Sequence, residues 1–213
     1  EIVEIISNGF DFHRENIIEI PRADFIKKVD EIKVIKEEMD ITQGKLVMGY
    51  RCNVDYKDEF KYYSLFVGSN VLGGGPHSKL FVNVREKESL CYYIYSSLEK
   101  YKTSMFISSG IESENYDKTV ELIGEQLKSL KEGKISDEEL LNSKSAIISS
   151  LKTIKDSLGG SSDFYFSQSM GGTNTTVEKI IEMIEKVTVS DIVETFKNIE
   201  LDTIYFLSNN KEA

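Results

Sequence analysis

The sequence is poor in the residues that build metal sites and cross-links. Its 213 residues include two cysteines, two histidines and no tryptophan. Cys52 and Cys91 lie in separate apolar runs without a Cys-x-x-Cys partner, which favours two buried free thiols over a disulfide. Zinc needs three or four converging ligands, and neither His-x-x-Glu-His nor its reverse occurs around His13 or His77. We therefore expect this chain to bind no metal by itself.

Long apolar runs and an excess of positive charge are also missing. The longest mostly apolar stretch, about residues 62–67, is far shorter than a membrane span, and no signal peptide is visible. The formal net charge of -10 argues against a nucleic-acid groove or an anionic membrane as a partner, because both require clusters of Lys and Arg. We expect a cytoplasmic protein with no membrane span and no nucleic-acid partner.

The positions of the prolines and the alternation of apolar with other residues indicate how the first 54 residues are organised. Pro21 and Pro76 are the only prolines, and both indicate boundaries. Residues 1–40 are charged and mixed, and 30–40 form either a linker or an edge strand followed by a loop. Apolar residues alternate from Lys45, which predicts a strand over about 45–54. Because the chain begins with Glu1 inside a segment that already looks structured, we expect it to be a piece of a longer polypeptide.

The remaining residues alternate helical and strand patterns. The stretch 58–72 is apolar on most sides, which predicts a buried helix. Two aromatic-rich runs, 90–98 and 103–111, are joined by a polar turn and predict a hairpin. Other helices are expected over 78–89, 115–132, 136–158, 162–170, from a capping box at 175–178, and over 188–198, before a closing strand at 203–207. This order predicts an α+β fold, a mainly antiparallel sheet with long helices packed on one face.

Two nearby features could carry chemistry. Gly73, Gly74 and Gly75 form the one glycine-rich loop between helices. Such a loop can bring backbone close to a ligand, but the simpler interpretation is a helix stop and a tight turn that needs positive φ. A self-sufficient hydrolase that uses His77 and a serine is a weak alternative, because no Gly-x-Ser-x-Gly motif is present.

Arg85 and Tyr92 are the second feature. They would share one face if the helix were continuous, since seven residues make nearly two turns. If the helix ends near Ser89, Tyr92 instead opens the following strand. An arginine offers five fixed donors, and a tyrosine hydroxyl can donate to a carbonyl or a developing oxyanion. The structural alternative places Arg85 in a surface charge run and Tyr92 in the core, on the side of Leu90 and Ile94.

Taken together, these motifs resemble one family. Gly73–Gly75, Ser78, Leu80-Phe81, Val84–Lys87, Leu90 and Tyr92 resemble the C-terminal half-domain of the pitrilysin/insulinase (inverzincin) zinc peptidases, which include mitochondrial processing peptidase and insulin-degrading enzyme. Residues 43–51 and 187–192 resemble the opening strand and last helix start of this half, so the resemblance covers about 43–208. It is strongest to bacterial two-subunit members related to mitochondrial processing peptidase.

The resemblance implies a division of labour. In the family, one half carries zinc on His-x-x-Glu-His and a downstream Glu, and the opposing half supplies an Arg and a Tyr that hold the substrate backbone. Here these residues would be Arg85 and Tyr92, with Gly73–Gly75 as a substrate loop. Residues 1–40 would be the end of a preceding half-domain and a linker, and 41–213 the C-terminal half-domain. Its partners would be a peptide and a homologous half or subunit that supplies zinc.

This chain is thus expected to be inactive alone, as the substrate-binding part of a zinc metallopeptidase. The alternative is a catalytically inactive structural or assembly module of the same fold.

Overall fold

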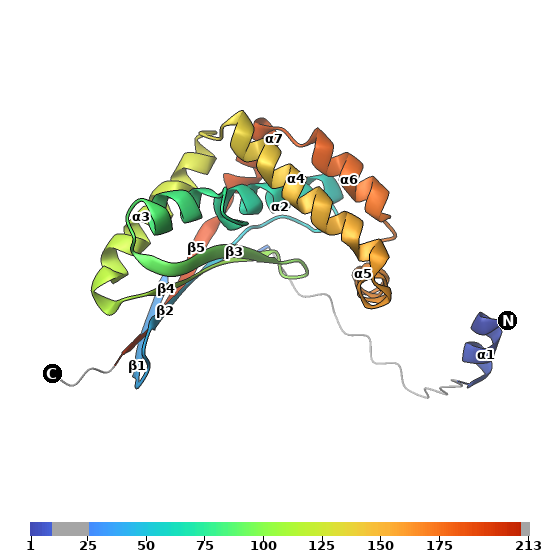
Figure 1. Ribbon diagram of the computed structural model, residues 1–213, viewed down its shortest axis with the longest axis horizontal. Coiled ribbons are helices and arrows are strands. Elements are labelled where there is room, and N and C mark those ends of the chain that lie inside the picture. The colour runs from blue at the N-terminus through green and yellow to red at the C-terminus, as the bar shows by residue number, and fades with distance from the viewer. Residues whose placement is uncertain (10–25, 210–213) are drawn as a thin grey trace.

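A five-stranded sheet lies under a layer of helices in the computed structural model, which describes residues 1–9 and 26–209 (Figure 1). The strand order is β1-β5-β2-β4-β3. Only β1 and β5 pair in parallel, and the other neighbours are antiparallel. The strands are β1 (Lys33–Met39), β2 (Gly44–Arg51), β3 (Cys91–Glu99), β4 (Ser104–Ile111) and β5 (Glu200–Asn209). The predicted α+β architecture is confirmed, whereas the predictions about His13 and Pro21 lie outside the described residues.

Helices from α2 onward lie on one face of this sheet, whereas α1 (Ile2–Gly9) has no buried residue and lies apart from the sheet (Figure 1). The helices of the layer are α2 (Glu59–Gly73), α3 (Tyr116–Lys131), α4 (Asp137–Thr153), α5 (Leu158–Gly171), α6 (Val177–Lys186) and α7 (Val189–Phe196), with a π-helix at Phe81–Glu86 and short 3₁₀ turns at Ser113–Asn115 and Ile154–Asp156. As predicted, α2 is apolar all round and buried, because the sheet lies beneath it and α4, α6 and α7 pack on it. None of the described helices is long and apolar enough to cross a bilayer.

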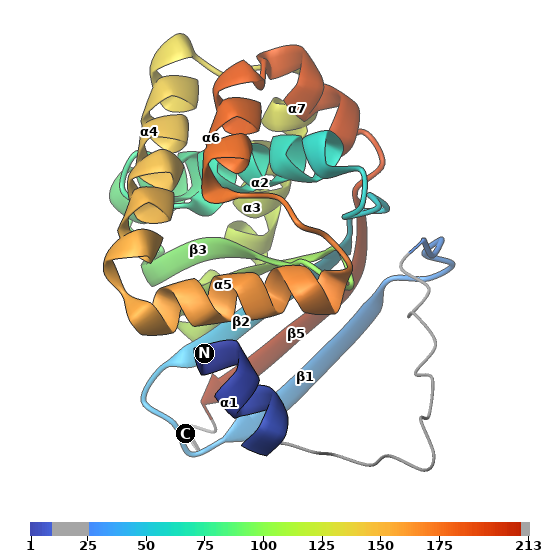
Figure 2. The ribbon, with the colours of Figure 1, turned by 90° about the vertical axis from the view of Figure 1, so that its right-hand side faces the viewer.

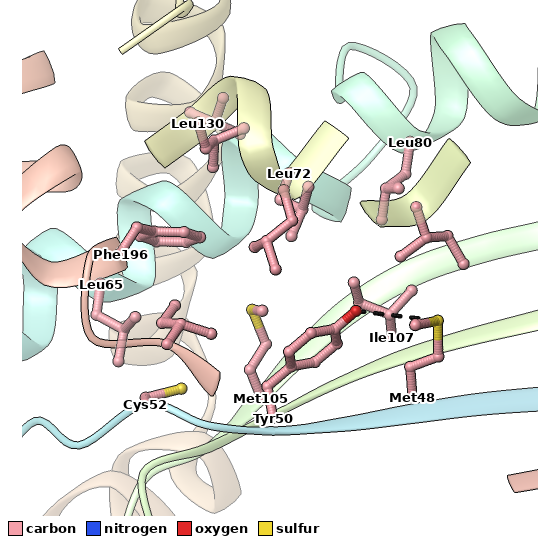
Figure 3. Packing of buried hydrophobic residues seen from close by; sticks show 14 of the residues in the cluster. Met48, Tyr50, Cys52, Leu65, Leu72, Leu80, Met105, Ile107, Leu130 and Phe196 are labelled. Atoms are coloured by element: carbon pink, nitrogen blue, oxygen red, sulfur yellow. Dashed lines mark hydrogen bonds between the residues drawn. The ribbon is translucent and has the colours of Figure 1, made fainter. Parts of the chain in front are cut away.

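The core fills the space between the sheet and the helices (Figure 3). Period-two alternation points one side of each inner strand into this layer, and burial of each large apolar side chain contributes about 1.5–3 kcal/mol. The fully buried side chains include Leu46, Met48, Leu65, Leu72, Met105, Ile107 and Phe196. Residues 26–209 place no helix layer on the other face of the sheet, where Tyr95 and Phe106 are exposed.

Cys52 and Cys91 are both buried and free, as predicted. Residues 33–39 form the edge strand that the sequence left open beside a linker, and they join the same sheet through β5 (Figure 2). The boundary at residue 40 between a preceding half-domain and this one stays a prediction.

The helix expected over 136–158 is shorter than predicted. It begins at the predicted capping box, where Ser136 and Glu139 satisfy each other's backbone amides, but α4 ends at Thr153. Ser157 takes an extended conformation, and its hydroxyl accepts a hydrogen bond from the amide of Gly160. Ser157 therefore caps a new helix, so Gly160 lies in the first turn of α5 instead of ending α4.

The capping box predicted at 175–178 is also wrong by one residue. The hydroxyl of Thr176, not that of Thr175, accepts from the amide of Lys179. Thr175 instead donates to the Glu59 carboxylate at the start of α2. The side chain of Thr175 thus forms a hydrogen bond to a residue distant in sequence and does not cap the helix.

Candidate functional site

The two predicted contact residues lie at the junction between the π-helix and β3. The helix ends at Glu86, and Ser89 then adopts a left-handed conformation with φ of 54°. This turn separates Arg85 on the helix from Tyr92 on the strand. Of the two possibilities left open by the sequence, Tyr92 therefore opens the hairpin strand, and the continuous helix is wrong.

Tyr92 is exposed, which overturns its placement in the core. Strand alternation would put it on the buried side with Ile94. However, β3 and β4 shift register between Cys91 and Tyr93, and the extra residue is Tyr92. This bulge leaves Cys91 and Ile94 buried while 60% of Tyr92 is solvent-exposed.

The phenol of Tyr92 is held by an acidic neighbour. Its hydroxyl donates a hydrogen bond of 2.7 Å to Oε1 of Glu112, a residue just beyond the end of β4. This hydrogen bond and the charge of Glu112 raise the pKa of Tyr92 above its usual value. The phenol therefore keeps its proton at neutral pH and can act as a donor. Glu112 was not identified from the sequence, because nothing in the sequence places it opposite residue 92.

The guanidinium of Arg85 is exposed and lies on an aromatic ring. Its Cζ is 4.7 Å from the centre of the Phe81 ring, one π-helical turn earlier. No carboxylate among the described residues forms an ion pair with it. The pKa of Cys91 is raised by burial, and the charge of Arg85 partly offsets this increase. The π-helix that carries Arg85 packs against β3, the strand that carries Tyr92.

The three glycines of the predicted loop serve different purposes. Gly73 ends α2 and is buried, and a Cβ on it would lie 2.5 Å from the amide nitrogen of Ser96 on β3. A Cβ on Gly74 would collide with Asn70. The helix stop is confirmed, but the expected positive φ is wrong, because none of the three adopts it. Close approach, not backbone conformation, requires glycine at 73, and a substrate-loop role remains a prediction.

The described residues hold no metal-ligand set, and His77 forms no hydrogen bond to a serine among them. No group of three His, Cys, Asp or Glu side chains in residues 1–9 and 26–209 could hold a metal ion. The zinc of the resembled family therefore does not fit this part of the chain. Nε2 of His77 lies 3.3 Å from Oδ1 of Asn70, and the hydroxyl of Ser136, which lines the same surface hollow, caps α4. This arrangement gives His77 no serine partner.

Comparisons with known proteins identify relatives of similar sequence and fold. A Bacillus subtilis protein named probable inactive metalloprotease YmfF is 39% identical over 92% of this chain and 45% of its own length. A crystal structure of a conserved protein from Enterococcus faecalis superposes with a TM-score of 0.82 at 32% identity, over 88% of this chain and 44% of that one. A protease from Helicobacter pylori shares the fold, with a TM-score of 0.80 at 18% identity over 97% of this chain and 51% of that one.

The chain thus spans less than half the length of the first of these relatives. A family profile described as the peptidase M16 inactive domain matches residues 10–147, more than half of the sequence. The chain therefore belongs to the peptidase M16 inactive-domain family, within the zinc peptidases that its motifs resemble.

Proposed function

We propose that this chain is the substrate-binding, zinc-free half of an M16-type zinc metallopeptidase. In this proposal, Arg85 and Tyr92 contact the backbone of an extended peptide, and a homologous half or a second subunit supplies the zinc. The chain alone would not cleave peptides. The observation that carries the proposal is the exposure of both side chains at one junction, where neither is used to build the core.

Arg85 is suited to binding a peptide carbonyl. The guanidinium carbon of Arg85 lies over the Phe81 ring, and its N–H donors lie in the plane of the group and point outward from it. No described carboxylate neutralises the charge. A substrate carbonyl could therefore accept a charge-assisted hydrogen bond from Arg85.

Tyr92 would orient the same substrate and stabilise charge in the transition state. Its single proton now points to Glu112, so the phenol oxygen can accept a backbone N–H without any change. Donation to a developing oxyanion would require the phenol to leave Glu112. Such a donor is used most strongly in the transition state, where removing one typically costs about 10²–10³ in kcat.

The alternative is a structural or assembly module that has lost all part in hydrolysis. The name of the Bacillus subtilis relative, probable inactive metalloprotease, favours it. That alternative predicts Arg85 in a buried ion pair and Tyr92 in the core, and neither arrangement occurs in the described residues. The exposed pair therefore supports the peptide-binding proposal. A cytoplasmic location and the absence of nucleic-acid partners remain predictions.

The test is peptide cleavage by the full protein assembled with its zinc-bearing half or subunit. Arg85→Ala should lower kcat/KM about a hundredfold or more, because a positioning donor is lost. Arg85→Lys should recover only part of this loss, since lysine lacks the planar fork. Lys87→Ala is the control, because it removes an exposed cation from the same segment. Equal kcat/KM for Arg85→Ala and Lys87→Ala would reject the role of Arg85.

A further inference from the structure

A small hollow lies on the side of the sheet opposite the helix layer. Its volume is about 190 Å³. It is lined by Gly49, Tyr50 and Arg51 of β2, Lys102, Ser104 and Phe106 of the hairpin, and Asp202 and Thr203 of β5. Sites for whole small molecules usually measure about 300–1,000 Å³. The hollow therefore has room for one side chain or chain end, and it involves neither Arg85 nor Tyr92.

The missing side chain of Gly49 creates this space. A Cβ added there would meet the Phe106 ring at 3.5 Å and the carbonyl oxygen of Thr203 at 3.9 Å. Both are ordinary contact distances, so an alanine would fit without moving the backbone. Glycine weakens a strand interior and often marks a position that another group approaches closely. The register of β2 against β5 shifts between Gly49 and Tyr50, and such bulges often carry glycine. The glycine at this bulge leaves the floor of the hollow open.

The rim of the hollow is positively charged. Nε of Arg51 donates a 2.7 Å hydrogen bond to Oδ2 of Asp202, and the Thr203 hydroxyl donates to Oδ1 of Asp202 at 2.6 Å. The hydrogen bond from Thr203, followed by that from Arg51, lowers the pKa of Asp202. No described residue accepts a hydrogen bond from the two terminal nitrogens of Arg51, and Lys102 has no ion pair there. The hollow thus holds two cations and one carboxylate, both of whose oxygens already accept hydrogen bonds. This local excess of positive charge occurs in a chain of net charge -10.

We propose that this hollow binds a carboxylate attached to an apolar body. The body would lie on Gly49 against the Phe106 ring, and the carboxylate would accept hydrogen bonds from Arg51 and Lys102. The C-terminus of a peptide and an acidic side chain within it carry the same chemistry. The inference rests on the proposed function in that the natural ligand is taken to be part of a peptide substrate.

The first test uses a small probe and does not depend on peptide binding. 3-Phenylpropanoate, an anion at neutral pH, is titrated into the full chain and followed by amide NMR. The amides of Gly49, Arg51 and Phe106 should shift together in a saturable way. Gly49→Ala fills the floor and should weaken binding about tenfold or more, while Gly124→Ala, a glycine substitution in open space on α3, should not change it. Arg51→Gln should weaken binding similarly.

The second test compares three labelled peptides of one alanine-rich sequence. One has a free C-terminal carboxylate, one is amidated and lacks acids, and one is amidated with an internal glutamate. At least one acid-bearing peptide should bind about tenfold more tightly than the neutral peptide, and Gly49→Ala should abolish the difference. Which of the two gains affinity identifies the source of the carboxylate.

Some results would overturn the inference. The carboxylate site is rejected, whether or not peptides bind, if the probe causes no shifts or causes shifts only outside the hollow. It is also rejected if the shifts persist unchanged in Gly49→Ala. Equal binding of all three peptides, with weaker binding by Arg85→Ala, would reject the hollow and retain the proposed function. Probe binding at the hollow without binding of any peptide would reject the proposed function and retain the carboxylate site.

Discussion

Two tyrosines of this chain form nearly the same hydrogen bond in different places. Tyr92 donates to Glu112 and Tyr205 donates to Glu37, each at 2.7 Å. In both cases the glutamate raises the pKa of the phenol, first through the hydrogen bond. A hydrogen bond from a tyrosine to a glutamate is therefore not by itself evidence of a functional site. What distinguishes Tyr92 is the bulge that exposes it and the nearby unpaired guanidinium of Arg85.

Because the thiol of Cys52 is buried, the free energy of unfolding depends on pH in the alkaline range. Burial raises its pKa to about 12, against about 8.5 in an unfolded chain. Below about pH 8.5 both states keep the proton. As the pH rises toward 12, the unfolded state releases it while the folded state does not, so folding loses up to about 1.4 kcal/mol per pH unit.

Cys52→Ala should remove this contribution. Between about pH 8 and 10, the free energy of unfolding of the variant should fall by about 2 kcal/mol less than that of the wild type. Urea denaturation at several pH values measures both slopes, and any cost of the smaller side chain is a constant offset that leaves the slope unchanged. Parallel pH profiles would show that the thiol is not protected as the fold implies.

At the scale of elements, α2 and β3 touch through small residues. The hydroxyl of Ser96 donates to the carbonyl oxygen of Ser69 at 2.6 Å, and Gly73 lies against the Ser96 amide. This contact sets the distance between α2 and β3, the strand that carries Tyr92. It also explains why the glycine loop begins with a residue that solvent does not reach.

Gly73→Ala should therefore separate the two elements. Its Cβ would meet backbone that cannot rotate away, and we expect a loss of about 1–3 kcal/mol in the free energy of unfolding, measured in urea. Gly124→Ala, with nothing within 4 Å, should instead stabilise α3 by about 0.5–1 kcal/mol. A neutral Gly73→Ala would mean that α2 is not held against β3 as closely as described.

Elements with strong periodic patterns were predictable from the sequence, and their ends and irregularities were not. The buried α2, the hairpin and α3 follow from apolar spacing that the tertiary structure keeps. The register shift at Tyr92 and the break at Ser157 depend on neighbours distant in sequence or on competing local caps. The candidate residue Arg85 could be named from the sequence, but Glu112 and the hollow at Gly49 required the sheet to be assembled.

Among the residues that the structure describes, helices cover one face of the sheet and leave the other open, and the chain matches only part of longer relatives. A half-domain of this kind can add hydrogen-bond donors to a reaction whose metal lies elsewhere. The described residues supply exposed donors at the π-helix junction and no metal ligand set. At this scale the proposal requires a second, zinc-bearing half that closes against the chain.

The most direct measurement compares Tyr92→Phe with Tyr205→Phe in the assembled enzyme, using kcat/KM for peptide cleavage. Each substitution removes one hydroxyl and one 2.7 Å bond to a glutamate, so their effects on folding should be similar. Tyr92→Phe should lower kcat/KM about a hundredfold, mainly in kcat, while Tyr205→Phe should leave it unchanged. Equal activities of the two variants would contradict the claim that this zinc-free half takes part in hydrolysis through Tyr92.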